Sequence, residues 1–259
     1  MDTPDGRWYA VLFQDHGASG RIPILIPITW DGDIPVFGVG GKIPETFPVI
    51  DNKPNHIYQP LVQGDDFKAP VETNELLKER YGCFGLKSVW QFNHEPDMSL
   101  VHWEQDKGVL GVETGKLSTN LTQARNILTQ RMIYPGCTGE VTVDGSMLKD
   151  GDYAGICALQ GCYGMVALTK RNGQNFIVMM NKEADNSSLQ AMKPDDEAGR
   201  EWEVVMTKEN TLRLKVEVDF TEMKDEARFF YYNGNDWIGI GKTHKLYFKM
   251  DHFTGCRFG

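Results

Sequence analysis

Apolar and polar residues alternate in short runs along most of the chain, and this period of two is typical of half-buried β-strands. Turn sequences such as Arg171-Asn-Gly and Asn233-Gly-Asn separate the runs. The predicted strands are 7–14, 22–30, 34–38, 89–94, 99–106, 108–114, 128–134, 138–144, 153–159, 162–170, 174–181, 201–207, 211–219, 227–232, 236–240 and 244–250. Helical periodicity is confined to 73–80 and 121–126. Many short strands without a strand–helix rhythm predict an all-β protein, either a sandwich or a barrel.

Residues 41–88 interrupt this pattern. They contain scattered polar residues and the prolines Pro44, Pro48, Pro54, Pro60 and Pro70. A loop of this length with little structure of its own is unusual inside one domain. We therefore expect a β segment at 1–40, a connector at 41–88 and a β domain at 89–259.

The β segment at 1–40 is too small to stand alone, because three strands in about 40 residues cannot bury a core. Its strand Ile22–Trp30 is apolar at nearly every position, which suits burial on both faces. We therefore expect this segment to belong to a larger unit that the chain does not contain. The alternative is that it packs against the β domain.

Charge and composition exclude several classes of protein. The 259 residues carry 27 Lys and Arg against 36 Asp and Glu, a net charge of −9, which argues against nucleic-acid and membrane-surface partners. No stretch of about 18 apolar residues could span a bilayer, and the sequence at Met1 has no features of a signal peptide. Five cysteines without a framework spacing favour free thiols. We expect a cytoplasmic location, unless the N-terminus is truncated.

Signatures of catalysis are weak. The run Gly111-Val-Glu-Thr-Gly-Lys-Leu117 resembles a phosphate loop, but the glycine spacing is one residue short and Leu117 replaces the Mg²⁺-binding hydroxyl. Two facing carboxylates would suit glycoside hydrolysis. No spacing selects a pair among the acids Asp15, Asp51, Glu104, Glu113, Asp152 and Asp251. The residues alone predict a non-catalytic β protein.

Amides and aromatic rings suggest a sugar site. Amides can satisfy sugar hydroxyls, and aromatic rings stack on the C–H faces of sugars. The candidates are Asn126, Gln130, Gln160, Tyr163 and Trp90, with further rings at Phe92, Phe230, Tyr232 and Trp237. Buried polar side chains also need hydrogen-bond partners inside a protein. A structural polar network and ordinary core packing therefore remain open as alternatives.

Longer motifs resemble glycoside hydrolase family 43. The runs Arg7-Trp-Tyr-Ala-Val-Leu-Phe-Gln-Asp-His-Gly17, Gly20-Arg-Ile-Pro-Ile-Leu25 and Thr29-Trp30 resemble the final blade of the family's five-bladed propeller. Five later runs resemble the C-terminal β-sandwich of the family's β-xylosidase and α-arabinofuranosidase branch. They are Trp90-Gln-Phe-Asn93, Ala124–Arg131, Asp150–Ile156, Gln160–Gly164 and Asp251–Gly255. The resemblance implies a concanavalin A-like jelly roll, classed as carbohydrate-binding module family 91, after a remnant of a propeller blade.

The resemblance also indicates what the chain lacks. The family's catalytic Asp, Asp and Glu lie upstream of Met1, and the family continues beyond Gly259 into a last strand, so the sandwich is expected to be truncated there. Arg21 matches an arginine that reaches into the sugar site, where a guanidinium fork suits hydroxyl groups. Phe253 matches a loop residue that walls the mouth of that site. Neither residue can hydrolyse a glycosidic bond.

The expected function is that of an accessory part of a xylan- or arabinoxylan-degrading hydrolase. It would bind or frame xylo-oligosaccharide and complete the rim of the active site, with the propeller of the same enzyme as its partner. No turnover is expected from this chain alone. Alternatives are a competent β-xylosidase or α-L-arabinofuranosidase subunit, a purely structural sandwich, or a lectin or polysaccharide lyase on the same fold. No cofactor is certain; jelly rolls can hold Ca²⁺ through loop oxygens, but no ligands are marked here.

Overall fold

The computed structural model describes residues 1–49, 55, 57, 60–68, 86–185, 197–249 and 254–259. The chain divides into two compact units. The N-terminal unit comprises Met1–His16 and Arg21–Gln59, and the sandwich unit comprises Gly17–Gly20 and Pro60–Gly259. In the described ranges, no helix has both the length and the apolar character needed to cross a bilayer.

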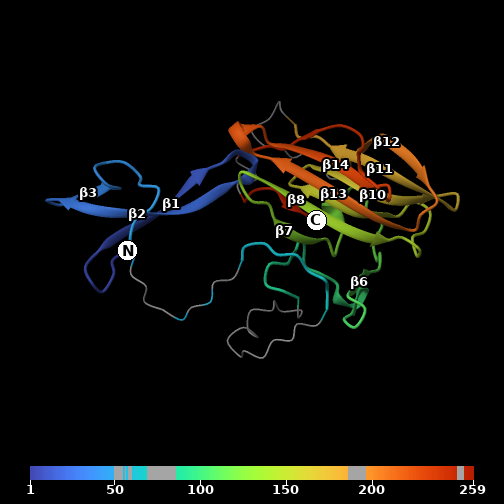
Figure 1. The fold of residues 1–259 in the computed structure, drawn as a ribbon, viewed down its shortest axis with the longest axis horizontal. Helices are drawn as coiled ribbons and strands as arrows, with labels where there is room; N and C mark the ends of the chain where they lie inside the picture. The colour runs from blue at the N-terminus through green and yellow to red at the C-terminus, as the bar shows by residue number, and fades with distance from the viewer. Residues whose placement is uncertain (50–54, 56, 58–59, 69–85, 186–196, 250–253) are drawn as a thin grey trace. The chain divides into compact units, whose positions relative to one another are not determined.

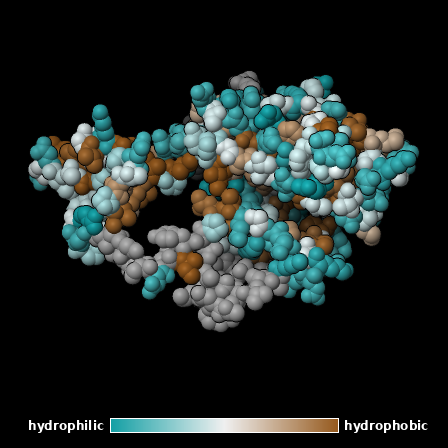
Figure 2. Space-filling model, in the orientation of Figure 1, coloured by the Kyte–Doolittle hydropathy of each residue, from teal (hydrophilic) through white to brown (hydrophobic). Residues whose placement is uncertain are grey.

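The N-terminal unit is built on one antiparallel sheet in the order β1-β2-β3. Its strands are β1 (Trp8–Asp15), β2 (Arg21–Asp31) and β3 (Ile34–Phe37) (Figure 1). The sheet leaves large apolar side chains in solvent, and Figure 2 shows brown apolar surface over these strands. Ile26 is the only buried residue of β2, so the burial predicted for Ile22–Trp30 is not supplied by the described residues, and the larger unit expected around this strand stays a prediction.

The sandwich unit contains two larger sheets (Figure 1). One has seven strands in the order β12-β11-β10-β9-β17-β7-β4, and the other has the path β15-β14-β13-β8 with β16 beside β14. The strands of the first sheet are β4 (Gln91–Phe92), β7 (Leu128–Arg131), β9 (Tyr153–Leu159), β10 (Tyr163–Arg171), β11 (Gln174–Lys182), β12 (Arg200–Thr207) and β17 (Arg257–Phe258). Those of the second are β8 (Gly136–Asp144), β13 (Thr211–Asp219), β14 (Glu226–Tyr232), β15 (Trp237–Gly239) and β16 (His244–Lys245).

Short elements complete the sandwich unit. A hairpin of β5 (Val101–Glu104) and β6 (Val109–Val112) forms its own two-stranded sheet. Single 3-10 turns lie at η1 (Gly17–Ser19), η2 (Met98–Leu100), η3 (Leu121–Gln123) and η4 (Thr221–Met223). The helix predicted at 121–126 is therefore one 3-10 turn, because Asn120 caps its start and Asn126 has a left-handed φ of 60°.

The main core lies between the two large sheets. Leu168 and Met179 of the seven-stranded sheet face Leu214 and Phe229 of the second sheet, and all four are almost fully buried. A second apolar layer covers the opposite face of the seven-stranded sheet, where Met165 packs among residues that include Leu121 and Ile127. Burial on both faces explains why β10 is nearly continuously apolar.

The Gly17–Gly20 turn is part of the sandwich core. Ala18 is completely buried, its N–H donates to Asp225 Oδ1 at 3.0 Å, and its carbonyl accepts from Cys256 N at 2.9 Å. Gly17 has a φ of +58°, and a Cβ there would collide with the Asp225 carboxylate. Glycine is therefore required at this position by both conformation and space.

Most strand predictions coincide with observed strands, and the all-β class is confirmed. The short β17 strand was missed, and the predicted strands 89–94 and 244–250 shrink to β4 and β16. The helix predicted at 73–80 lies outside the described residues. The boundary between the two units falls within the predicted 41–88 connector; the three-part division itself stays a prediction.

Candidate functional site

The Gln160 amide is held by the backbone of one distant residue. Its Nε2 donates to the Tyr247 carbonyl at 2.9 Å, and its Oε1 accepts from Tyr247 N at 3.1 Å. Both groups are buried, and the Tyr247 hydroxyl accepts from Gly161 N at 3.1 Å. The Gln160 side chain thus pairs with the Tyr247 backbone as a neighbouring strand would, and its own polar atoms have hydrogen-bond partners.

Two more candidate amides adopt the same arrangement. Gln130 Nε2 donates to the Gln63 carbonyl at 2.8 Å, and Gln130 Oε1 accepts from Gln63 N at 3.0 Å. Asn126 does the same with the backbone of Asp97, at 3.1 and 2.9 Å. Asn126 has a left-handed backbone and precedes β7, the strand that carries Gln130. The geometry favours the structural alternative for all three amides.

The two aromatic candidates have different settings. Tyr163 is buried at the start of β10, and burial raises the pKa of its hydroxyl. Trp90 is partly exposed and stacks on Phe67, with ring centroids 5.7 Å apart and an interplanar angle of 22°. Its Nε1 donates to Asp65 Oδ2 at 2.8 Å. One face of the Trp90 ring is therefore occupied by the chain itself.

The residues carried over from the family lie apart from these groups in the chain. Arg21 opens β2, donates to Asp15 Oδ1 at 3.0 Å and lies over the Phe13 ring at 4.9 Å. Phe253 lies outside the described residues. The sugar-binding roles of all seven candidates stay predictions.

The acidic residues considered for catalysis have separate partners. Glu104 pairs with Lys107, Glu113 pairs with His102 at 2.8 Å, and Asp152 Oδ2 accepts from Lys149 N at 2.9 Å. Asp51 and Asp251 lie outside the described residues. These contacts place the described acids in solvated turns and strand ends, with no shared site.

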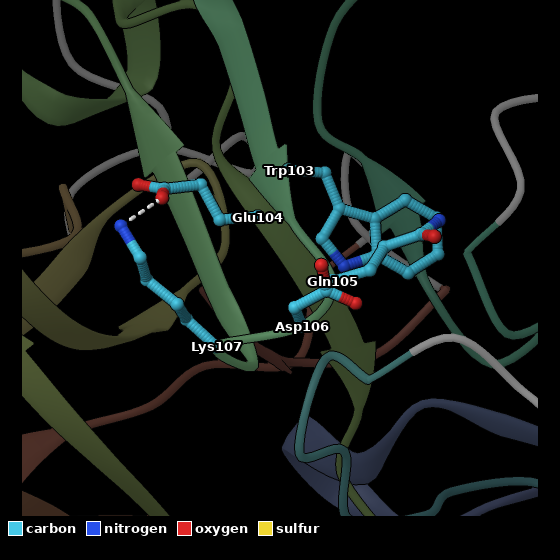
Figure 3. Close-up of a pocket in the computed structure, with 5 residues that line it drawn as sticks. All are labelled: Trp103, Glu104, Gln105, Asp106 and Lys107. Carbon is cyan, nitrogen blue, oxygen red and sulfur yellow. Dashed lines mark hydrogen bonds and ion pairs between the residues drawn. The ribbon is translucent and has the colours of Figure 1, made fainter.

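A shallow hollow lies at the turn of the β5–β6 hairpin (Figure 3). Five consecutive residues line it: Trp103, Glu104, Gln105, Asp106 and Lys107. The Trp103 Nε1 donates to the Phe67 carbonyl at 2.5 Å, and Figure 3 shows the Glu104–Lys107 pair to one side of the turn. An open turn with one acid neutralised by a lysine offers no pair of carboxylates for catalysis.

The exposed face of the second sheet carries rings and cations in alternation. Arg213 lies 5.1 Å from the Tyr232 ring centroid and 5.2 Å from that of Trp237. Lys215 lies 4.4 Å from the Phe230 ring centroid and 4.7 Å from that of Trp237. We call these five residues the cation–ring patch. Its cations stabilise the rings and occupy ring surface that a sugar would use.

The opposite outer face carries a polar cluster that sequence reasoning missed. The Tyr153 hydroxyl donates to Glu201 Oε1 at 2.9 Å, and Arg171 Nη2 pairs with the same oxygen. We call Tyr153, Arg171 and Glu201 the Tyr153 cluster. Residue 153 begins a predicted strand and Arg171 belongs to a predicted turn, but nothing in the sequence indicated that Glu201 joins them from β12.

Metal and thiol chemistry have little support. Across the described part of the chain, no group of three or more His, Cys, Asp or Glu is placed to hold a metal ion, so we assign no Ca²⁺ ligands. Cys157 and Cys162 are buried and form no disulfide. Burial raises the pKa of Cys157 to about 12, so its thiol stays protonated and unreactive.

Comparison with known proteins identifies the fold. Residues 84–259 match the family model described as the β-xylosidase C-terminal concanavalin A-like domain. A curated protein from Xylanibacter ruminicola named "Putative beta-xylosidase" is 31% identical over 163 residues, which are 60% of this chain and 27% of that protein.

Solved structures agree with this match. A chain titled bifunctional GH43-CE from Bacteroides eggerthii is 39% identical with a TM-score of 0.80, and the match covers 99% of this chain and 30% of that one. A xylan β-1,4-xylosidase from Bacillus halodurans shares the fold at 16% identity and a TM-score of 0.71, over 100% of this chain and 48% of that one.

The chain thus spans less than half the length of these relatives. The family match covers well over half of the present sequence, and the two-sheet sandwich on which it falls is the fold expected from the motifs. The chain belongs to the β-xylosidase C-terminal concanavalin A-like domains of glycoside hydrolase family 43.

Proposed function

We propose that this chain is the accessory, non-catalytic portion of a xylan- or arabinoxylan-degrading family 43 hydrolase, and that its partner is the propeller of the same enzyme. The relatives named for β-xylosidase activity are much longer, which supports a division of labour between this portion and a catalytic one. The described acids considered for catalysis already pair with separate groups, so the proposal assigns no hydrolysis to this chain.

The exposed apolar face of the N-terminal sheet carries the proposal. Trp8, Leu12 and Trp30 are each more than a third exposed. The register pairs Trp8 with Ile28 and Leu12 with Ile24, so these apolar side chains share one face of the sheet. An apolar sheet face of this kind is typical of an interface that another part of a protein covers. The family's last propeller blade would be covered in this way by its neighbours.

Complementation tests the proposal. We would mix this chain with the Bacteroides eggerthii relative truncated before the matched segment and measure hydrolysis of aryl-β-xyloside and aryl-α-arabinofuranoside. We expect no turnover from this chain alone and restored turnover from the mixture. Leu12→Asp should abolish the restoration, because a carboxylate cannot be buried unpaired in an apolar interface. Met147→Asp, an equally drastic change at an exposed apolar residue of the sandwich unit, is the matched control.

Three results would overturn the proposal. A mixture without restored turnover would show that the two portions do not complement each other. Clear turnover by this chain alone would favour a competent subunit. Equal complementation by Leu12→Asp and Met147→Asp would show that the apolar face is not the interface.

A purely structural sandwich is the second candidate, and the three backbone-bound amides favour it. Affinity electrophoresis in gels that contain soluble xylan separates it from a sugar-binding sandwich. A folded chain that migrates without retardation would support the structural role alone.

A further inference from the structure

We propose that the Tyr153 cluster is a binding platform for a neutral pyranose unit of xylan on the outer face of the seven-stranded sheet. The choice of sugar rests on the proposed function, whereas the location rests on the geometry of the cluster. None of the seven site residues predicted from the sequence belongs to this cluster, although Tyr153 lies within the Asp150–Ile156 motif.

The Tyr153 side chain lies along the sheet. Tyr153 begins β9 and Glu201 lies on β12, and β10 and β11 separate these strands. Three strand spacings are about 14 Å, yet the Tyr153 hydroxyl and the Glu201 carboxylate are 2.9 Å apart. Both side chains must therefore extend toward each other across β10 and β11.

The ring is exposed and unoccupied. Tyr153 is 41% exposed, and no other ring or cation of the described residues stacks on it. Trp237 of the cation–ring patch has two cations beside its ring instead. Among the described residues, Tyr153 therefore differs from Trp237 in having no ring or cation against it, which leaves its ring to the C–H surface of a sugar.

Polar groups surround the ring at low net charge. Arg171 and Glu201 neutralise each other, and both of their bonds in the cluster use Glu201 Oε1. The second carboxylate oxygen and the remaining guanidinium N–H groups are available to accept from and donate to sugar hydroxyls. A neutral cluster with donors and acceptors matches an uncharged sugar better than a phosphate or an acidic ligand.

The floor of the cluster contains an unused hydroxyl. Thr169 lies opposite Tyr153 in the β9–β10 register and opposite Phe176 in the β10–β11 register. It is completely buried, and its Oγ1 has no hydrogen-bond partner within the described part of the chain. Such an atom costs free energy, but because Thr169 is completely buried its hydroxyl lies out of reach of a sugar on the surface.

Apolar surface continues the platform toward the sheet edge. Met206 lies opposite Phe176, and Val204 lies opposite Val178 in the β11–β12 register. Met206 and Val204 are both exposed on the edge strand β12. The platform therefore extends from Tyr153 to Met206 and is wider than one sugar ring, which suits a short stretch of a polysaccharide.

Calorimetric titration of the full chain with xylohexaose, an uncharged probe, tests the platform. We expect Tyr153→Ala to weaken binding by about tenfold or more, the loss typical of an aromatic anchor. Trp237→Ala is the matched control and should bind within about twofold of wild type. Tyr153→Phe keeps the ring and loses its tether, so it should fall between wild type and Tyr153→Ala.

The outcomes separate the platform from the proposed function. Circular dichroism and urea unfolding would show that each variant is folded. A folded wild-type chain that does not bind xylohexaose would overturn the platform, as would Tyr153→Ala that binds like wild type. The complementation assay depends on the N-terminal sheet and not on Tyr153. If complementation fails while xylohexaose still binds through Tyr153, the proposed function is overturned and the platform is not.

Discussion

Strands β10 and β2 have similar apolar sequences and very different surroundings. In β10 the seven residues Tyr163–Thr169 are all buried, whereas in β2 Ile26 alone is buried. The second sheet covers one face of β10, and a layer that includes Leu121 and Ile127 covers the other. The described residues supply no such cover to β2. An apolar strand therefore predicts two covering layers, but it does not predict that both belong to the same chain.

The largest expected difference between the two units concerns single core side chains. Leu214→Ala should lower the free energy of unfolding of the sandwich unit by about 3 kcal/mol, because Leu214 is completely buried between the sheets. Leu12→Ala in the N-terminal sheet should cost less than about 0.5 kcal/mol. Urea unfolding followed by circular dichroism measures both. Equal losses would contradict the contrast in burial.

Acidification should destabilise the sandwich unit through His244. Burial lowers the pKa of His244 to about 4, from 6.5 in an unfolded chain. Protonation of His244 therefore favours the unfolded chain. The free energy of unfolding is highest above pH 6.5 and falls as the pH drops from 6.5 toward 4. The full loss is about 3 kcal/mol.

The control for this prediction replaces His244 by a residue that can keep its polar contacts. Asn181 Nδ2 lies 3.2 Å from His244 Nδ1, and Cys162 Sγ lies 3.9 Å from Nε2. His244→Gln keeps a polar group there and removes the titration. Its unfolding free energy should vary less between pH 6.5 and 4 than that of wild type. An unchanged pH dependence would assign the acid sensitivity to other groups.

The backbone-bound amides should differ according to their exposure. Gln160→Ala removes two hydrogen bonds to the buried backbone of Tyr247, which should cost about 2 kcal/mol. Gln130→Ala exposes the Gln63 backbone to water, which replaces the lost bonds, so the cost should stay near 0.5 kcal/mol. Urea midpoints of the two variants at neutral pH test this order, and the reverse order would refute it.

The smallest effect on stability is expected in the N-terminal sheet. Val11→Thr combined with Phe13→Thr should change the free energy of unfolding by less than about 0.5 kcal/mol, because both side chains are exposed. The same variant should bind less of a fluorescent hydrophobic dye. Dye binding equal to that of wild type would mean that these side chains do not form the apolar surface that the dye detects.

Much of the fold could be predicted from local sequence. The strands β9, β10 and β11 match their predicted ranges to within a residue, because apolar runs and the glycine-containing turns between them are local signals. Strand β17 was missed because its two residues pair with β7 and β9, more than 95 positions away. Pairing at that distance leaves no periodic signal in two residues.

The candidate site was less predictable than the fold. Alternation identified Gln130 and Gln160 as polar residues that need partners, but their partners are 67 and 87 positions away. Sequence alone could not distinguish a distant backbone group from a sugar hydroxyl. Tyr153 was missed because it resembles an ordinary first residue of a strand until Glu201 is placed beside it.

The Gly17–Gly20 turn has a practical consequence for dissecting this protein. The chain enters the sandwich unit at Gly17, leaves it after Gly20 and returns at Pro60. A fragment cloned from Pro60 onward would lack Ala18 from its core and would leave the Asp225 carboxylate without its N–H donor. Isolating the sandwich therefore requires a grafted turn or a circular permutant, and a shortened clone that aggregates would say nothing about its affinity for sugars.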